Sequence, residues 1–260
     1  MILNLCLTLN NVLRRQHGCN VILVIAGFVG AGKTTISSVA KAYFAKQNLS
    51  TCYDSLTAFP VLSYAFFRML GMICYGSKVL NYYESIKVHP STLLVKRIIK
   101  FPKIIKLIIL VMEIFSLILR LLILLLRSRG RDIIIIDEGF INIIANYIEI
   151  LNKEAIYLTY MLVSIVNIIS KKFKIYTFFL KTNLKVLSTR WKRRGYPKTT
   201  SLIDRTHHIY YNLFLLNIAR NIYGQYFHVI DLDANKGLPE MVCQIVSQVS
   251  CQQFSKDLTL

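Results

Sequence analysis

The stretch NVILVIAGFVGAGKTT, residues 20–35, decides the fold. Residues 20–26 form an apolar, β-branched run that leads into a glycine, which is typical of a buried parallel strand. Residues 27–34 then read G-F-V-G-A-G-K-T and match the phosphate-binding pattern G-x-x-x-x-G-K-[ST] in full. A helical pattern over residues 33–47 follows directly. The sequence therefore predicts a phosphate-binding loop between a strand and a helix, the context that this motif requires.

The residue types in this loop suit the binding of ATP with Mg²⁺. Its glycines allow backbone conformations in which successive N–H groups point at phosphate oxygens. We expect Lys33 to reach the β- and γ-phosphates, and the Thr34 hydroxyl to coordinate Mg²⁺. Thr35 lies at the helix start, where it can touch the α-phosphate. The predicted ATP-binding residues are Gly27, Phe28, Val29, Gly30, Ala31, Gly32, Lys33, Thr34 and Thr35.

A second acidic position follows the run DIIIID, residues 132–137, which predicts a buried strand. In proteins with this loop, a neighbouring strand delivers a carboxylate to the Mg²⁺ or its waters, and Asp137 fits that role. Glu138 could orient or deprotonate the attacking group, or bind substrate. The structural alternative is that Asp137 only caps the helix that begins near Phe140.

The remaining patterns alternate between strands and helices, which predicts an α/β fold with helices on both faces of a parallel sheet. The further strands are expected at 50–56, 173–180 and 226–232, and the further helices at 140–169, 184–194, 204–222 and 238–253. We expect residues 1–19 to be a loosely attached extension and residues 20–253 to be one domain.

A helical insertion is expected at residues 61–130, because prolines and glycines divide it into helices near 61–70, 78–88, 91–101 and 103–127. Residues 104–126 are long enough to cross a bilayer, which needs about 20 apolar residues. However, Lys106, Glu113, Arg120 and Arg127 recur every seven residues and form one polar stripe. We favour a helix buried in the domain, and keep open a helix that lies on or packs in a membrane.

A basic segment at residues 184–200 predicts a lid. Arg190, Arg193 and Arg194 share one helical face, because they are spaced i, i+3, i+4. Arginines that close over phosphates stabilise the charge that develops during phosphoryl transfer. The alternatives are a solvated basic face or a patch that binds nucleic acid.

Charge and composition limit the function classes further. Lys and Arg number 32 against 13 Asp and Glu, which gives a net charge of +19 and favours an anionic substrate or partner. The 54% of hydrophobic residues exclude a disordered chain and leave membrane contact open. The six cysteines show no C-x-x-C spacing, and the apolar start precedes Arg14-Arg15, unlike a secretory signal. We therefore expect a cytoplasmic protein, with membrane association through 104–126 and a homodimer both left open.

Taken together, these segments resemble the thymidylate kinase group of nucleoside monophosphate kinases over about residues 20–250. The resemblance rests on the phosphate-binding loop, the D-E-G strand end, the run L-K-x-N-x-K-V-x-x-x-R-W-K-R-R-G and the late H-V-I-D-L-D-A-N. It implies a five-stranded parallel sheet of order 2-3-1-4-5, a closing lid and transfer of the γ-phosphoryl group of ATP. It also implies that adenine binds near the lid base and the 231–236 loop.

The sequence departs from that group on the acceptor side. Thymidylate kinases carry D-R-[YFH] after the third strand, whereas residues 137–140 here read D-E-G-F. Their second strand usually ends in an R-x-P-type turn, whereas Asp54-Ser55-Leu56 stands here. Deoxynucleoside kinases place a carboxylate at that strand end as the base, which makes Asp54 a candidate. The predicted acceptor is a small molecule, first a nucleoside monophosphate and otherwise a nucleoside or sugar.

Other function classes stay open beside the kinase. The strand I-I-I-I-D-E also resembles that of ATP-hydrolysing motors, whose Glu activates water. A GTPase is disfavoured because Leu238 stands where the guanine-reading N-K-x-D needs an aspartate. A membrane-associated or nucleic-acid-binding protein could retain the fold alone. We favour the kinase, because the arginine lid has no role in the other classes.

Overall fold

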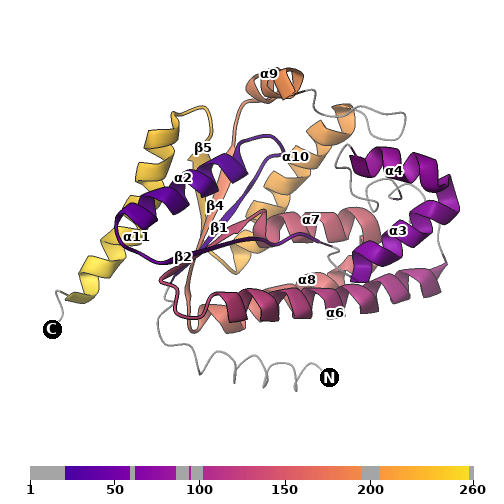
Figure 1. Ribbon diagram of the computed structural model, residues 1–260, viewed down its shortest axis with the longest axis horizontal. Coiled ribbons are helices and arrows are strands. Elements are labelled where there is room, and N and C mark those ends of the chain that lie inside the picture. Colours follow the sequence, from indigo (N-terminus) through magenta and orange to yellow (C-terminus); the bar gives the residue numbers. More distant parts are fainter. Residues whose placement is uncertain (1–20, 59–61, 86–93, 95–101, 195–204, 258–260) are drawn as a thin grey trace.

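A five-stranded parallel sheet forms the centre of the molecule (Figure 1). The computed structural model describes residues 21–58, 62–85, 94, 102–194 and 205–257, with the side chains of 83–85, 154, 194, 205–208 and 250–257 left outside. The strand order is β2-β3-β1-β4-β5, as predicted. The strands are β1 (Val21–Gly27), β2 (Thr51–Ser55), β3 (Ile133–Asp137), β4 (Lys174–Lys181) and β5 (Val229–Asp233).

The central strands are buried because helices cover both faces of the sheet. Every residue of β1 and β3 is buried. The helices α2 (Lys33–Lys46) and α11 (Leu238–Asp257) cover one face, while α7 (Gly139–Leu151) and α10 (Arg205–Asn221) cover the other (Figure 1). The helix α8 (Ala155–Ser170) packs on α7, and α9 (Leu184–Arg194) lies beyond the end of β4.

The helical insertion contributes three described helices. They are α3 (Leu62–Tyr75), α4 (Ser77–Ser85) and α6 (Lys103–Arg127), and α3 packs against both of the others. The bounds of α6 match the prediction. Of the helix expected at 91–101 only the buried Leu94 belongs to the described residues. The extension 1–19 also lies outside them.

Two helices replace the helical stretch expected at 140–169. The α-helix ends before Asn152, where φ is +55°. A short 3-10 helix, η1 (Asn152–Glu154), then separates α7 from α8. Asparagine tolerates this left-handed conformation better than most residues. The break lets α8 fold back on α7. The start of the last strand is also later than predicted, because η2 (Tyr223–Gln225) and the residues after it precede β5.

The helix α6 buries its polar face and exposes an apolar face, the reverse of an ordinary amphipathic helix. Glu113, in the middle of its polar stripe, is fully buried, and Arg120 reaches Asp54 in β2. The opposite side of α6 exposes seven large apolar side chains: Ile104, Leu107, Ile108, Val111, Phe115, Leu119 and Leu126. The expectation of a helix buried inside the domain is therefore correct for one face only. Long-range partners of the polar residues, which the periodicity does not reveal, decide which face turns inward.

Candidate phosphate-binding and acceptor site

The phosphate-binding loop follows β1 at the carboxyl end of the sheet, where ligands of parallel α/β folds bind. Its three glycines all have positive φ: Gly27 +136°, Gly30 +83° and Gly32 +105°. A Cβ on Gly27 would lie 2.2 Å from the Leu180 carbonyl oxygen, and one on Gly30 would lie 2.4 Å from Trp191 Nε1. Both positions therefore require glycine for conformation and for space.

Several backbone N–H groups of the loop are used within the protein. The N–H of Phe28 donates to the Leu180 carbonyl at 2.9 Å, and that of Ala31 to the Phe28 carbonyl at 3.1 Å. The N–H of Val29 donates to Asn212 Oδ1 at 2.8 Å. Asn212 is fully buried in α10. The first N–H groups of α2 have no partner within the helix, so they are available to bind phosphate.

Lys33 folds back over this loop. Its Nζ donates to the carbonyl oxygens of Gly27 and Phe28, each at 3.3 Å, and the side chain is buried. Glu138 Oε1 lies 4.0 Å from the same Nζ. The ammonium group is thus held where the loop encloses its bound anion, as its position in the motif predicts.

Thr34 and Asp137 meet, although 103 residues separate them in the sequence. The Thr34 hydroxyl donates to Asp137 Oδ2 at 2.7 Å, and the Tyr53 hydroxyl donates to the same oxygen at 3.1 Å. Asp137 is buried, and its Oδ1 has no hydrogen-bond partner among the described residues. Burial and the Asp137 carboxylate raise the pKa of Tyr53 to about 12, which keeps this hydroxyl a donor.

The Thr34–Asp137 pair fits Mg²⁺ by the chemistry of its oxygens. A hydroxyl and a carboxylate are hard ligands, and Mg²⁺ in nucleotide sites takes one or two such ligands together with phosphates and waters. The buried, unpartnered Oδ1 is an acceptor that a cation or its waters would satisfy. In the described ranges no group of three or more His, Cys, Asp or Glu forms a separate metal site.

Glu138 begins α7 from a strained backbone position. Its φ is +70°, and its N–H donates to the Ile25 carbonyl at 3.0 Å, so it continues the ladder between β3 and β1. The carboxylate is 47% exposed and points toward the Lys33 ammonium. Glu138, rather than Asp137, occupies the cap position of α7, and the described side chains provide no cap hydrogen bond there. The capping alternative for Asp137 therefore finds no support.

The helix α9 is fixed to the phosphate-binding loop by two side chains. The Arg190 guanidinium donates to the Ala31 carbonyl at 2.9 Å and to the Ala234 carbonyl at 2.8 Å. Trp191 Nε1 donates to the Val29 carbonyl at 3.1 Å. Arg193 is exposed, and the side chain of Arg194 and the lid residues 195–200 lie outside the described residues. Arg190 thus connects the loop, α9 and the segment after β5.

Asp54 and Arg120 form an ion pair, of which the sequence analysis predicted only Asp54 as a site residue. Arg120 Nη2 donates to Asp54 Oδ1 at 2.5 Å and to the Ser55 carbonyl at 3.0 Å. Arg127 Nη1 lies 3.7 Å from Asp54 Oδ2. In the parallel register Ser55 pairs with Asp137, and the two side chains lie on the same face of the sheet. Asp54 precedes Ser55 in β2, so its side chain lies on the opposite face, where Arg120 of α6 binds it. Arg120 and Arg127 belong to the charged residues that recur every seven positions in α6, but this spacing did not indicate that they bind Asp54.

A buried polar cluster joins α3, α6 and α7 beside this site. Glu113 accepts hydrogen bonds from Ser63 Oγ and from the Tyr147 hydroxyl, each at 2.6 Å. Ser63 Oγ also lies 3.2 Å from Ser116 Oγ. Burial and the neighbouring Glu113 raise the pKa of Tyr147 well above its ordinary value. These contacts fix α6 to α3 and α7. No sequence pattern marked Ser63 or Tyr147 as members of this cluster.

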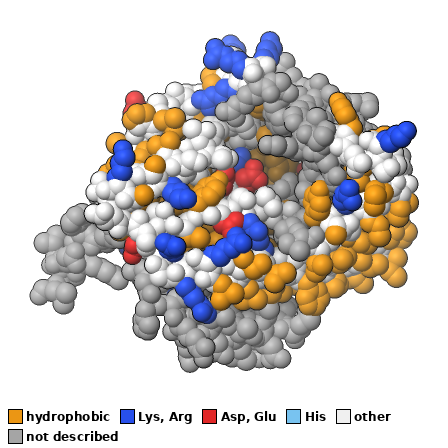
Figure 2. Space-filling view, in the orientation of Figure 1, with side chains coloured by type: hydrophobic (Ala, Val, Ile, Leu, Met, Phe, Trp, Pro, Cys, Tyr) orange, Lys and Arg blue, Asp and Glu red, His pale blue; other side chains and the backbone are white. Residues whose placement is uncertain are grey.

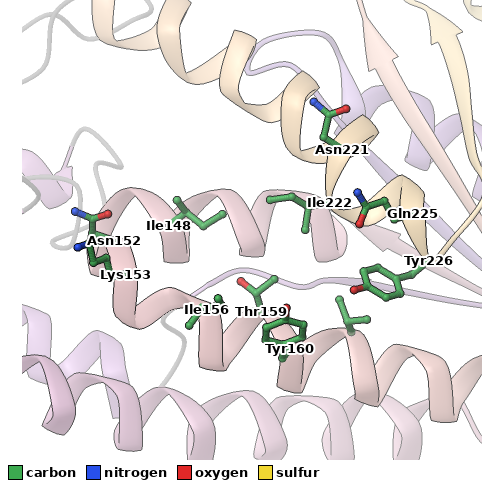
Figure 3. A pocket seen from close by; sticks show the side chains of 11 residues that line it. Ile148, Asn152, Lys153, Ile156, Thr159, Tyr160, Asn221, Ile222, Gln225 and Tyr226 are labelled. Carbon is green, nitrogen blue, oxygen red and sulfur yellow. The ribbon is translucent and has the colours of Figure 1, made fainter.

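A cavity of about 620 Å³ lies away from these residues, between α7, α8 and the end of α10 (Figure 3). Asn152 and Lys153 lie at one end of it and Tyr226 at the other (Figure 3). None of the predicted site residues lines this cavity.

Comparison with known proteins finds similarity among solved structures. No family model matches the chain, and no curated protein matches it. Among solved structures, deoxyadenosine kinase from M. mycoides with bound dATP aligns with a TM-score of 0.49 and 19% identity, over 88% of this chain and 99% of that chain. The same enzyme with bound dCTP aligns with a TM-score of 0.48 and 20% identity, over 89% and 100%. From its own loop and strand order, the chain has the α/β fold of phosphate-binding-loop proteins, with five parallel strands in the order 2-3-1-4-5.

Proposed function

We propose that this protein is an ATP-dependent phosphotransferase that acts on a hydroxyl group of a small acceptor. The observation that carries the proposal is the contact between Thr34 and Asp137 beside the buried Lys33 ammonium. Lys33 would neutralise charge on the β- and γ-phosphates, and the N–H groups at the start of α2 would bind phosphate oxygens. Thr34 and Asp137 would hold Mg²⁺, which bridges phosphate oxygens and lowers their charge during transfer.

We favour a nucleoside as the acceptor over a nucleoside monophosphate. A nucleoside hydroxyl needs a general base. Arg120 holds Asp54 near the end of β2 through Oδ1, while the buried Oδ2 accepts no hydrogen bond among the described residues and would be the basic oxygen. A monophosphate instead needs cations for its phosphate, but Arg120 and Arg127 are already paired with Asp54. The monophosphate, and with it the thymidylate kinase type, is the second candidate, because Arg127 is 63% exposed and could change partner.

The arginines of α9 would contribute in two ways. Arg190 binds two backbone carbonyls, so we assign it the positioning of the phosphate-binding loop. Arg193 and Arg194 remain the candidates for contacting the phosphates during transfer. ATP hydrolysis is the alternative function, since the half-exposed Glu138 carboxylate lies beside Lys33 and could orient a water molecule.

A screen of acceptors tests the proposal. ADP release from ATP is measured with deoxynucleosides, nucleoside monophosphates and sugars as separate additions. We expect stimulation by one nucleoside class, and we expect Asp54→Asn to abolish that stimulation while ATP binding persists. Stimulation by a monophosphate that survives Asp54→Asn would exclude the nucleoside acceptor. Hydrolysis that no acceptor changes would favour the ATPase.

A further inference from the structure

The exposed side of α6 is a continuous apolar ridge. We define the ridge as seven side chains between 42% and 67% exposed: Ile104, Leu107, Ile108, Val111, Phe115, Leu119 and Leu126. Their spacing of mostly three or four residues places them on one side of the helix, along its whole length. Figure 2 shows hydrophobic side chains gathered in the region of α3 and α6. Exposed apolar patches of this kind mark surfaces for a membrane or another protein.

The opposite side of α6 packs against the rest of the protein. Glu113 is buried between Ser63 and Tyr147, and Arg120 binds Asp54. By length and composition alone α6 could cross a membrane, and 33% of its apolar window is buried inside the protein. A crossing helix would have to break these contacts with α3, α7 and β2. The ridge is therefore available to a membrane only if α6 lies flat on its surface.

Charge distinguishes a membrane from a second copy of this chain. The exposed Lys103 lies at the start of α6, and the exposed Arg129 and Arg131 follow just after its end. Glu113 is the only acidic residue of α6, and it is buried. Two copies that meet along α6 in antiparallel orientation would bring these cations together, which is unfavourable. Anionic lipid headgroups would neutralise the cations, while the ridge enters the boundary between headgroups and acyl chains.

We propose that the α6 ridge docks this protein flat on an anionic membrane surface. The apolar ridge supplies the buried area, and the cations at both ends of α6 supply attraction to the lipid headgroups. The docked protein keeps the buried cluster of Glu113 intact.

Sedimentation with vesicles at physiological salt tests this proposal. The probes are phosphatidylcholine vesicles with and without phosphatidylserine. The ridge variant is Leu107→Ser with Val111→Ser and Phe115→Ser. The matched control replaces three exposed apolar residues of α2 and α10, as Val39→Ser with Tyr210→Ser and Leu213→Ser. We expect binding only to the phosphatidylserine vesicles, about tenfold or more weaker for the ridge variant and unchanged for the control.

A fluorescence variant makes the test independent of whether the triple variant folds. Phe115→Trp places an indole on the ridge, whereas the native Trp191 is buried and away from it. We expect its emission to shift to shorter wavelength on phosphatidylserine vesicles, and Leu213→Trp to show no shift. Failure of the wild type to bind these vesicles would overturn the proposal. Equal binding by the folded ridge variant would overturn it as well, as would a wild-type dimer that the ridge variant turns into a monomer.

Discussion

The phosphate-binding side and the helical insertion side of this molecule are built in different ways. On the first side, consecutive residues of one loop supply most of the chemistry, and the backbone conformation of Gly27, Gly30 and Gly32 shapes it. On the second side, single residues from separate helices and strands meet, such as Arg120 with Asp54 and Glu113 with Tyr147. A local site is encoded by a short motif, whereas a site assembled from distant segments depends on the packing of the whole domain.

The largest effect is expected at the local site. Lys33→Ala removes the charge that binds the β- and γ-phosphates, so ATP-dependent turnover should fall by roughly 10³-fold or more. The variant should still fold, because the ammonium group contacts only loop carbonyls in the described structure besides the distant Glu138. ADP production and circular dichroism measure both effects, and Lys41→Ala, an exposed lysine of α2, is the control. Near-normal turnover in Lys33→Ala would contradict the catalytic role of this loop.

A smaller, graded effect is expected at Asp137, beside the phosphate-binding loop. Asp137→Asn should lower turnover by about 10²-fold or more and raise the Mg²⁺ concentration needed for half-maximal rate, because a charged ligand is lost. Tyr53→Phe removes only the hydrogen bond to Asp137 Oδ2, so its effect should be a few-fold. Titration of turnover against Mg²⁺ separates the two variants. An unchanged Mg²⁺ dependence in Asp137→Asn would argue against a metal at this carboxylate.

A change in the contact between α9 and the loop should mainly affect stability. Gly30→Ala places a Cβ 2.4 Å from Trp191 Nε1, which overpacks the interface and strains a residue at φ +83°. We expect a loss of about 1–3 kcal/mol in the free energy of unfolding. Gly76→Ala is the matched control, since φ is +80° there but nothing lies within 4 Å of the added Cβ. Equal losses in urea unfolding of the two variants would show that Trp191 does not constrain the loop.

An effect of pH on stability is expected in α7, which contacts both sides. Burial raises the pKa of Glu149 from 4.5 to about 7, so the folded protein holds a proton there that the unfolded chain releases. This contribution to stability is fully present below pH 4.5 and is lost as the pH rises to about 7. Glu149→Gln should therefore stabilise the protein more at pH 8 than at pH 5, relative to wild type. Urea unfolding at both pH values measures this, and an equal difference at both would refute the raised pKa.

The sequence predicted the sheet and the phosphate-binding loop because both depend on local patterns. Buried runs such as IIII at 133–136 and the glycine spacing at 27–32 determine strand positions and backbone conformation directly. The order of the strands came from the resemblance to a known family. It is confirmed by the pairing of β1 with β3 and β4.

The residues that prediction missed act across long distances in the sequence. Asn212 lies 183 residues from Val29, whose N–H it binds, and Arg120 lies 66 residues from Asp54. No spacing rule connects such pairs. For α6, the polar stripe was recognised, but the periodicity does not indicate which side of the helix turns inward. The buried hydrogen bonds of Glu113 and the ion pair of Arg120 turned it inward.

Transfer of a labelled phosphoryl group tests the central claim most directly. With ATP labelled at the γ-phosphate and the stimulating nucleoside, the label can reach either the acceptor hydroxyl or water. We predict that labelled acceptor forms in proportion to the ADP produced, with little free phosphate, and that both products disappear in Lys33→Ala. Label that appears only as free phosphate, at a rate independent of the acceptor, would contradict phosphoryl transfer as the function of this site.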